Sequence, residues 1–342
     1  MKSLLSVVIL TAMLFFIGCD AGQTGFGLSA GGKTDVGLLR PGAIEIIRDG
    51  LADENPIIRS HAIEIVSATG TKELVPIVAK LLKDEPAPVR FAAAIVIGDM
   101  QYLAGEYALR RLLNDTDGSA KIAAAYALTK LGRGNYSDII RTALKGKDQT
   151  VRANAAMLLG KLGDKSDIEL LYRVRRDSDS ADKVRIQSLE SIAMLGDEKV
   201  YGAKSLYLLI SENADDKIMG IRILGALDTS EARNAIKTML YEDIPEVRLC
   251  AAEQLGRLGD TSGRPEVVEY FRRISRNPDD PSIANSMATM AIGRIGGDAL
   301  TVYLPRLLRS RSKMIRLIAA QSVLLLTQQM RAARMQEPTR YY

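Results

Sequence analysis

Few residues of this 342-residue chain have the types and spacing that catalysis requires. His61 is the only histidine, so the chain can assemble neither a histidine-rich metal site nor a Ser-His-Asp arrangement. Ser180 and Ser310 each stand three residues before a lysine, which is the Ser-x-x-Lys spacing of acyl-enzymes, but no supporting motif accompanies either pair. We therefore predict that the protein is not an enzyme and that it holds no metal ion or other cofactor.

A second short motif suggests nucleotide binding. Residues 27–34, GLSAGGKT, match the phosphate-binding P-loop pattern letter for letter. That loop works only between a strand and a helix, because its backbone amides must converge on the phosphate. No strand pattern precedes Gly27, and Gly37 and Pro41 interrupt any helix pattern after Thr34. We interpret the match as a coincidence.

The first 18 residues are typical of a secretory signal peptide. Lys2 precedes an apolar run at residues 4–17, and Gly18 stands before Cys19. The run would reach only about 21 Å as a helix, which is short of a hydrocarbon core of about 30 Å. Residues 16–19 (FIGC) resemble the bacterial lipobox, in which the cysteine is diacylated and becomes the new N-terminus. This resemblance implies a protein of the bacterial cell envelope, lipid-anchored through Cys19 at the periplasmic or extracellular face.

The segment after the anchor is different in composition. Residues 19–40 are rich in Gly and small polar residues and show no apolar period, so we expect a flexible tether. If Cys19 is acylated, Cys250 has no disulfide partner, and we expect it to be a small buried residue. An exported chain is not expected to bind nucleic acid.

The rest of the chain is organised by a pattern that returns about every 31 residues. Its anchor is basic in all copies but one: Arg59, Arg90, Lys121, Arg152, Arg185, Lys217, Arg248, Asn285 and Arg316. Three positions later the residue is always Ala, Ser or Gly, and seven positions later it is always Val, Ile or Leu. Both positions lie on one helical face, so the small residue lets a neighbouring helix approach and the aliphatic residue fills the space beside it. The residue eight positions after the anchor is also small in every copy except the last, which has Leu324.

A second periodic segment precedes each anchor, so each copy is a pair of helices that cannot bury its own apolar face. Self-similarity at this period predicts an all-α fold, an α-solenoid of about nine two-helix repeats over residues 41–330, followed by a tail at 331–342. At about 10 Å between helix layers, nine copies would form a rod or arc of roughly 90 Å. The last apolar helix, residues 315–326, would then cap one end of the core.

Several motifs resemble those of HEAT repeats, in particular the short HEAT-like repeats named after phycobilin lyases. The carriers are Val-Arg pairs such as Val89-Arg90 and Val151-Arg152, the alanines after them, and the runs LGKLGD (159–164) and LGRLGD (255–260). The resemblance implies a ladder in which the anchors pair with acids of neighbouring repeats, here Asp53, Asp84, Asp115, Glu242 and Asp279. The single histidine excludes the chemistry of deoxyhypusine hydroxylase, a HEAT-like enzyme whose di-iron site uses repeated His-Glu pairs.

The resemblance also implies that the second helices line a concave face. Apolar residues five positions after three anchors would lie there, beside lysines nine positions after two of them. We therefore expect a partner-binding groove formed by Ile95, Tyr126, Met157, Lys130 and Lys161. The alternative interpretation is that neighbouring helices partly bury these residues.

Positive charge gathers at the C-terminal end. Residues 301–342 contain eight basic residues and one acidic residue. We expect a basic patch formed by Arg306, Arg309, Arg311 and Lys313, which is either a solvated edge or a contact for anionic lipid or an acidic protein.

Two functions fit these observations. The favoured one is a non-enzymatic, membrane-anchored scaffold that binds protein partners in the cell envelope. The alternative is an accessory subunit of an envelope enzyme or transport complex, or a lyase-like HEAT protein that handles a bound cofactor.

Overall fold

The structure is a computed structural model that describes residues 33–274 and 282–336. Within these residues all regular elements are helices, so the predicted all-α fold is confirmed. The signal peptide, Cys19 and most of the expected tether lie outside the described residues.

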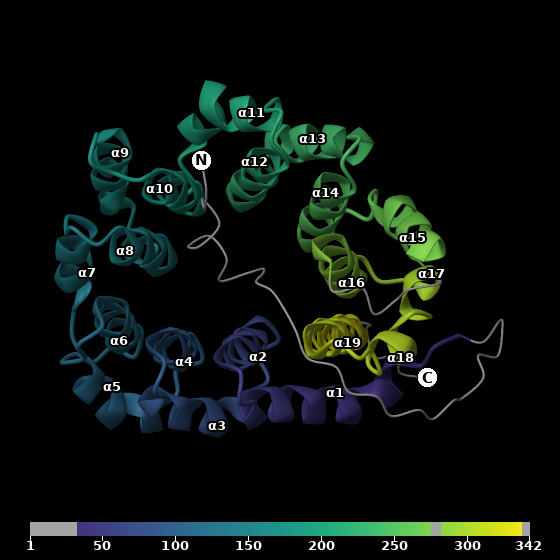
Figure 1. Ribbon diagram of the computed structural model, residues 1–342, viewed down its shortest axis with the longest axis horizontal. Coiled ribbons are helices and arrows are strands. Elements are labelled where there is room, and N and C mark those ends of the chain that lie inside the picture. Colours follow the sequence, from purple (N-terminus) through teal and green to yellow (C-terminus); the bar gives the residue numbers. More distant parts are fainter. Residues whose placement is uncertain (1–32, 275–281, 337–342) are drawn as a thin grey trace.

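The helices form two concentric layers, an inner and an outer one (Figure 1). The inner layer contains α2 (Pro56–Ala68), α4 (Ala87–Asp99), α6 (Gly118–Lys130), α8 (Gln149–Leu162), α10 (Asp182–Met194), α12 (Ala214–Leu227), α14 (Pro245–Arg257), α16 (Ile283–Ile295) and α19 (Lys313–Gln336). The outer layer contains α1 (Val36–Leu51), α3 (Val75–Lys80), α5 (Glu106–Leu112), α7 (Ser137–Leu144), α9 (Ile168–Arg176), α11 (Ala203–Leu209), α13 (Ser230–Thr238), α15 (Arg264–Arg273), α17 (Asp298–Thr301) and α18 (Leu304–Leu307). The nine inner helices of the described residues match the nine anchors of the sequence pattern.

The solenoid closes on itself. Helix α19 packs against α16 on one side and against α1 and α2 on the other, so the last repeat contacts the first (Figure 1). The expected rod or arc is therefore wrong, and so is the expected capping role of the last helix. Each repeat turns in the same sense relative to its neighbour, and nine such turns complete a circle. Helix α19 buries its apolar residues between two neighbours, including Ile315, Ala319 and Val323.

Glycines of the inner helices explain the tight curvature. At Gly98, an added Cβ would lie 2.7 Å from Ala127 Cα, and at Gly160 it would lie 2.9 Å from Ser191 Cβ. These glycines stand eight positions after the anchor, where the residue is small in most repeats. The most extensive contacts between inner helices are made by the pairs α4–α6, α8–α10, α14–α16 and α16–α19. In each of these pairs the first helix has glycine at that position. Because inner helices approach more closely where a side chain is missing, the inner layer is shorter than the outer one.

The anchors form the expected ladder. Five pairs join neighbouring repeats, namely Arg59–Asp84, Arg90–Asp115, Arg152–Asp177, Lys217–Glu242 and Arg248–Glu266, with N···O distances of 2.7, 2.8, 2.8, 2.5 and 2.7 Å. Asp279 lies outside the described residues. Anchors also bind their own repeat: Arg90 donates to the backbone carbonyl of Asp84, six residues earlier, at 2.8 Å. A further pair, between Lys313 and Asp53 at 2.7 Å, joins the last repeat to the first. Lys121 and Arg185 form no ion pair with a described residue of the next repeat, so the ladder is not continuous around the ring.

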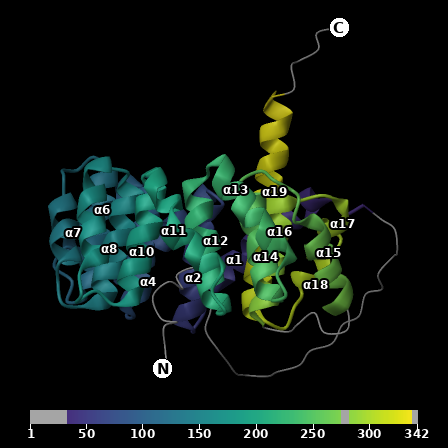
Figure 2. The ribbon, with the colours of Figure 1, turned by 90° about the horizontal axis from the view of Figure 1, so that it is seen from above.

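Both predicted ends of the solenoid need correction. Helix α1 begins at Val36, inside the segment expected to be a tether up to residue 40, because the Asp35 side chain accepts from the Gly37 amide and Ile44 and Ile47 bury their side chains in the core. Packing of α1 against α19 outweighs the missing N–H of Pro41. Helix α19 continues past residue 330 to Gln336, and its last turns project from the ring (Figure 2).

Candidate functional site

The predicted groove residues lie on the inner layer, but they do not form an open apolar groove. Tyr126 is only 1% exposed, and its hydroxyl donates a hydrogen bond to the carboxylate of Asp99. Lys161 lies 3.0 Å from the other oxygen of Asp99 and 5.9 Å from the centre of the Tyr126 ring. Burial, together with the charge of Asp99, raises the pKa of Tyr126, so the phenol stays a neutral donor.

The other three predicted groove residues are less covered. Ile95 and Met157 are half-buried and pack against the core, and Lys130 is half-exposed at the end of α6. The structure therefore brings Tyr126 and Lys161 together around the carboxylate of Asp99. Ile95 and Met157 are partly buried, as the alternative interpretation describes. A partner-binding role for this group stays a prediction.

The sequence interpretation missed Asp99. Its carboxylate also accepts from Ser67 on α2 at 3.4 Å, so one side chain of α4 links to α2, α6 and α8. A signal was available: Asp99 is the only acidic residue nine positions after an anchor, in a column where Lys130 and Lys161 are basic. An acidic residue at a repeat position that is basic in other repeats indicates an ion pair between repeats.

Charges also pair elsewhere on the inner layer. Nδ1 of His61 lies 3.5 Å from Glu64 Oε2 on α2, and Arg222 on α12 lies 3.8 Å from Glu190 on α10. Burial raises the pKa of Glu64, while His61 and the more distant Arg222 oppose the shift.

The residues with possible reactivity have structural roles instead. Ser180 is buried; its hydroxyl donates to the Val174 carbonyl at 2.6 Å, and Arg152 donates to it at 2.7 Å. Cys250 is buried as predicted, and burial raises the pKa of its thiol to about 12. Among the described residues, no group of three or more His, Cys, Asp or Glu side chains could hold a metal ion.

The predicted basic patch lies at the turn between α18 and α19. Arg306, Arg309 and Arg311 are exposed, whereas Lys313, although 57% exposed, forms the ion pair with Asp53 that joins the last repeat to the first. Lys313 is thus part of the closure, and contact of this patch with anionic lipid stays a prediction. No helix in the described ranges is both long and apolar enough to cross a membrane.

Exposed aromatic side chains lie on the outer layer instead. Tyr207 on α11 is 70% exposed, and Tyr241 at the end of the 3-10 helix η6 (Met239–Tyr241) is 87% exposed, with Ile210 nearby in sequence at 75%. Tyr207 and Ile210 precede α12 and Tyr241 precedes α14, and the Lys217–Glu242 ion pair joins these two neighbouring repeats at 2.5 Å. We call Tyr207, Ile210 and Tyr241 the tyrosine edge.

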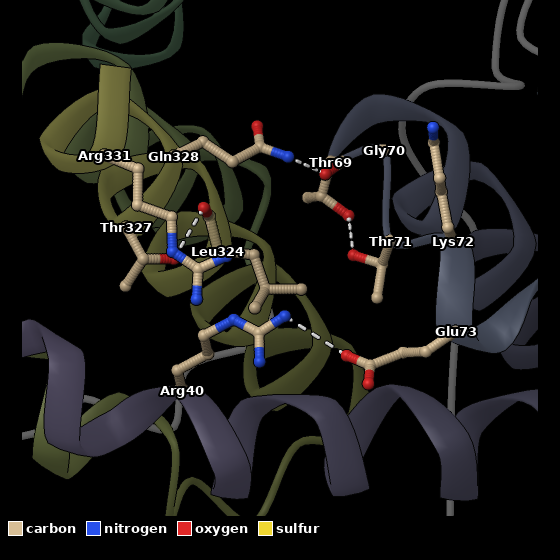
Figure 3. Close-up of a pocket in the computed structure, with 10 residues that line it drawn as sticks. All are labelled: Arg40, Thr69, Gly70, Thr71, Lys72, Glu73, Leu324, Thr327, Gln328 and Arg331. Atoms are coloured by element: carbon tan, nitrogen blue, oxygen red, sulfur yellow. Dashed lines mark hydrogen bonds and ion pairs between the residues drawn. The ribbon is translucent and has the colours of Figure 1, made fainter. Parts of the chain in front are cut away.

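A small cavity lies where the ring closes, between the first repeat and α19 (Figure 3). It has a volume of about 280 Å³ and is lined by Arg40, Thr69, Gly70, Thr71, Lys72, Glu73, Leu324, Thr327, Gln328 and Arg331. The side-chain amide of Gln328 donates to the Thr69 carbonyl across it, which adds one more link between the two ends of the solenoid. We call this cavity the seam pocket.

Comparison with known proteins gives a family match for the first part of the repeat region. Residues 37–98 and 106–193 match the family model described as HEAT repeats. No curated protein sequence matches the chain.

Several solved structures are similar to the chain at low sequence identity. Human deoxyhypusine hydroxylase in complex with glycerol is 16% identical, with a TM-score of 0.37 over 77% of this chain and 99% of that one. The complex of CpcE and CpcF of phycocyanin lyase from Nostoc sp. PCC7120 is 17% identical, with a TM-score of 0.44 over 74% of this chain and 100% of that one. Kap121p is 14% identical, with a TM-score of 0.32 over 87% of this chain and 39% of its own.

Proposed function

We propose that this chain, whose residues 37–98 and 106–193 match HEAT repeats, is a non-enzymatic scaffold that binds a protein partner in the bacterial cell envelope. We further propose that a lipid on Cys19 anchors it to the membrane, with the ring at the periplasmic or extracellular face. The ring supplies a rigid frame, since both ends of the solenoid are held by contacts of α19 with α1 and α2. A frame of this kind can hold a partner without changing its own shape.

The observation that carries the proposal is the tyrosine edge. Its three large side chains are exposed in neighbouring repeats, and tyrosine is enriched where proteins bind each other. The inner layer is less suited to recognition, because Tyr126, Asp99 and Lys161 already satisfy one another there. The partner is therefore expected to contact the outer layer and its edge.

The charges around the tyrosine edge indicate the chemistry of the partner. Glu212, Asp215 and Asp243 are exposed in the same two turns, and none of them forms an ion pair with another described residue. An acidic border around apolar side chains favours a partner segment that carries both apolar and basic residues. Such a segment would gain contact area from the tyrosines and orientation from the carboxylates.

The experiment compares partners captured in intact cells. Tyr207→Asp with Tyr241→Asp should remove the crosslinked partner, identified by mass spectrometry, while the helical content measured by circular dichroism stays unchanged. Tyr107→Asp is the matched control, because Tyr107 is 72% exposed on α5, in a different part of the outer layer. The same partner recovered from both variants would contradict the proposed surface.

The anchor has its own test. Cys19→Ser should shift the protein from the detergent phase to the aqueous phase of a detergent phase partition, since an acyl chain contributes about 0.8 kcal/mol per buried CH₂ group. Cys250→Ser should not change partitioning, because Cys250 is buried in the repeats. Equal partitioning of the wild-type protein and the Cys19→Ser variant would refute the lipid anchor.

A further inference from the structure

The seam pocket exists because the repeat pattern is broken at one position. The column that brings inner helices together contains Gly98, Gly160 and Gly293 elsewhere in the ring, but Leu324 in the last repeat. Leu324 is 2% exposed and lines the pocket. A leucine at this place keeps α19 further from α2 than a glycine would, and α19 and α2 make the least extensive contact of any neighbouring pair of inner helices. A cavity is left at the closure.

Positive charge dominates this cavity. Its lining residues include three bases, Arg40, Lys72 and Arg331, and one acid, Glu73. Nη2 of Arg40 lies 3.1 Å from Oε1 of Glu73, which neutralises one charge. Arg331 forms no ion pair with any residue that the structure describes. The Lys72 side chain is exposed and points away from the two guanidinium groups (Figure 3), so Arg331 carries the positive charge at the cavity that no acid of the lining offsets.

The two guanidinium groups come from opposite ends of the chain. Arg40 projects from α1 and Arg331 from α19, and Figure 3 shows both groups on the same side of the cavity, facing the space that Thr71 and Glu73 border. An anion placed between the two groups would contact both of them, and a nearby negative charge favours the charged form of each. Guanidinium forks bind tetrahedral and planar oxyanions through paired hydrogen bonds.

We propose that the seam pocket binds a phosphate group, bridged by Arg40 and Arg331. The sign of the charge fits, since a phosphate monoester carries about −1.5 to −2 at neutral pH and the bases of the lining outnumber its single acid. The size also fits: at about 280 Å³ the pocket is near the lower end of cavities that hold small molecules. It accepts a free phosphate, a small phosphate ester or the exposed phosphate of a lipid headgroup.

Binding has a structural consequence, because the ligand contacts the first and the last repeat together. It binds the closed ring and loses half of its contacts when α19 leaves α1, so it shifts the equilibrium toward closure. Phosphate binding thus stabilises the closed ring where α19 meets α2, the least extensive contact between neighbouring inner helices.

The test measures binding to the full chain in detergent. Isothermal titration with inorganic phosphate and with glycerol 3-phosphate should give saturable binding, and either ligand should raise the midpoint of thermal unfolding. Arg331→Gln should weaken binding at least tenfold and abolish the rise in midpoint. Arg111→Gln is the matched control, because Arg111 is an exposed arginine on α5 that does not line the pocket.

A second arm distinguishes the source of the phosphate. Vesicles that contain phosphatidic acid are compared with vesicles of phosphatidylcholine alone. Binding to the soluble phosphates, lost in Arg331→Gln, supports a free ligand. Binding only to phosphatidic acid, lost in Arg331→Gln and kept in Arg111→Gln, supports a lipid headgroup. No binding in either arm, or equal losses in the two variants, overturns the proposal.

Discussion

The curvature of the ring can be tested at Gly293, where α16 meets the closing helix α19. A Cβ added at Gly293 would lie 2.5 Å from Ser322 Cα and 2.8 Å from its Oγ. Because a backbone atom cannot yield as a flexible side chain does, Gly293→Ala must push the two helices apart. The Ser322 hydroxyl, which donates to the Thr289 carbonyl at 2.8 Å, would move with α19.

The expected magnitude follows from three opposing effects. Overpacking a tight contact costs about 1–3 kcal/mol, and loss of the buried Ser322–Thr289 hydrogen bond costs about 1 kcal/mol more. Alanine gains about 1 kcal/mol over glycine in a helix interior. We therefore expect Gly293→Ala to lower the free energy of unfolding by about 1–3 kcal/mol.

The control is the same substitution at an open site. Gly42 lies in α1, and an added Cβ there meets nothing within 4 Å. Gly42→Ala should raise the free energy of unfolding by about 0.5–1 kcal/mol through helix propensity alone. Urea unfolding followed by circular dichroism measures both, and small-angle scattering shows whether Gly293→Ala widens the ring. A stabilisation of similar size in both variants would refute the argument that missing side chains set the curvature.

Three further predictions concern charges. Lys313→Ala should lower the free energy of unfolding by no more than about 1 kcal/mol, because Lys313 is largely exposed while its partner Asp53 is 11% exposed; scattering should show that the ring stays closed. The hydrogen bond from Lys237 lowers the pKa of Asp260 to about 2, so this pair stabilises the fold above the unfolded-state pKa and loses that effect as the pH falls from about 4 to 2. Arg309→Glu should weaken binding of the protein to anionic vesicles at low salt, as measured by co-sedimentation.

Each of these predictions has a matched control. Lys83→Ala removes an exposed lysine for which no ion pair is seen among the described residues and should leave the free energy of unfolding unchanged. Asp260→Asn should flatten the pH dependence between pH 4 and pH 2, and an unaltered acid profile would contradict the assignment to Asp260. Arg111→Glu makes the same charge change on α5, so equal losses of vesicle binding in both variants would argue against a specific basic patch.

The repeats and the ladder could be predicted because they depend on local patterns. A basic residue and an acid six positions before the next anchor recur with the period of the helix pair, so their pairing follows once the helices stack. The observed Arg59–Asp84 and Arg90–Asp115 pairs confirm it. The column that holds Gly98 and Gly160 was visible in the sequence as well, but its effect on curvature was not.

The closure, the buried tyrosine and the true start of α1 could not be predicted in this way. Closure is the sum of nine small rotations, and a modest change in each would give an open arc instead. Tyrosine is a residue type suited to partner binding. Only the position of Asp99, one repeat away, makes Tyr126 a buried hydrogen-bond donor. Gly37 and Pro41 are typical of a loop, and contact of α1 with α19, far away in sequence, overrides that local preference.

An ion pair and apolar packing could each hold the ring closed, and the free energy that each contributes shows which of them does so. The closing ion pair joins an exposed Lys313 to Asp53, and pairs of this kind contribute about 0–1 kcal/mol. The apolar contact of α19 with its neighbours buries Ile315, Leu317 and Val323, and each such side chain contributes about 1.5–3 kcal/mol. Packing therefore closes the ring, and the ion pair fixes the register in which the two ends meet. Leu324 weakens that packing at the seam pocket alone, which makes this the junction where a bound anion has the largest effect on closure.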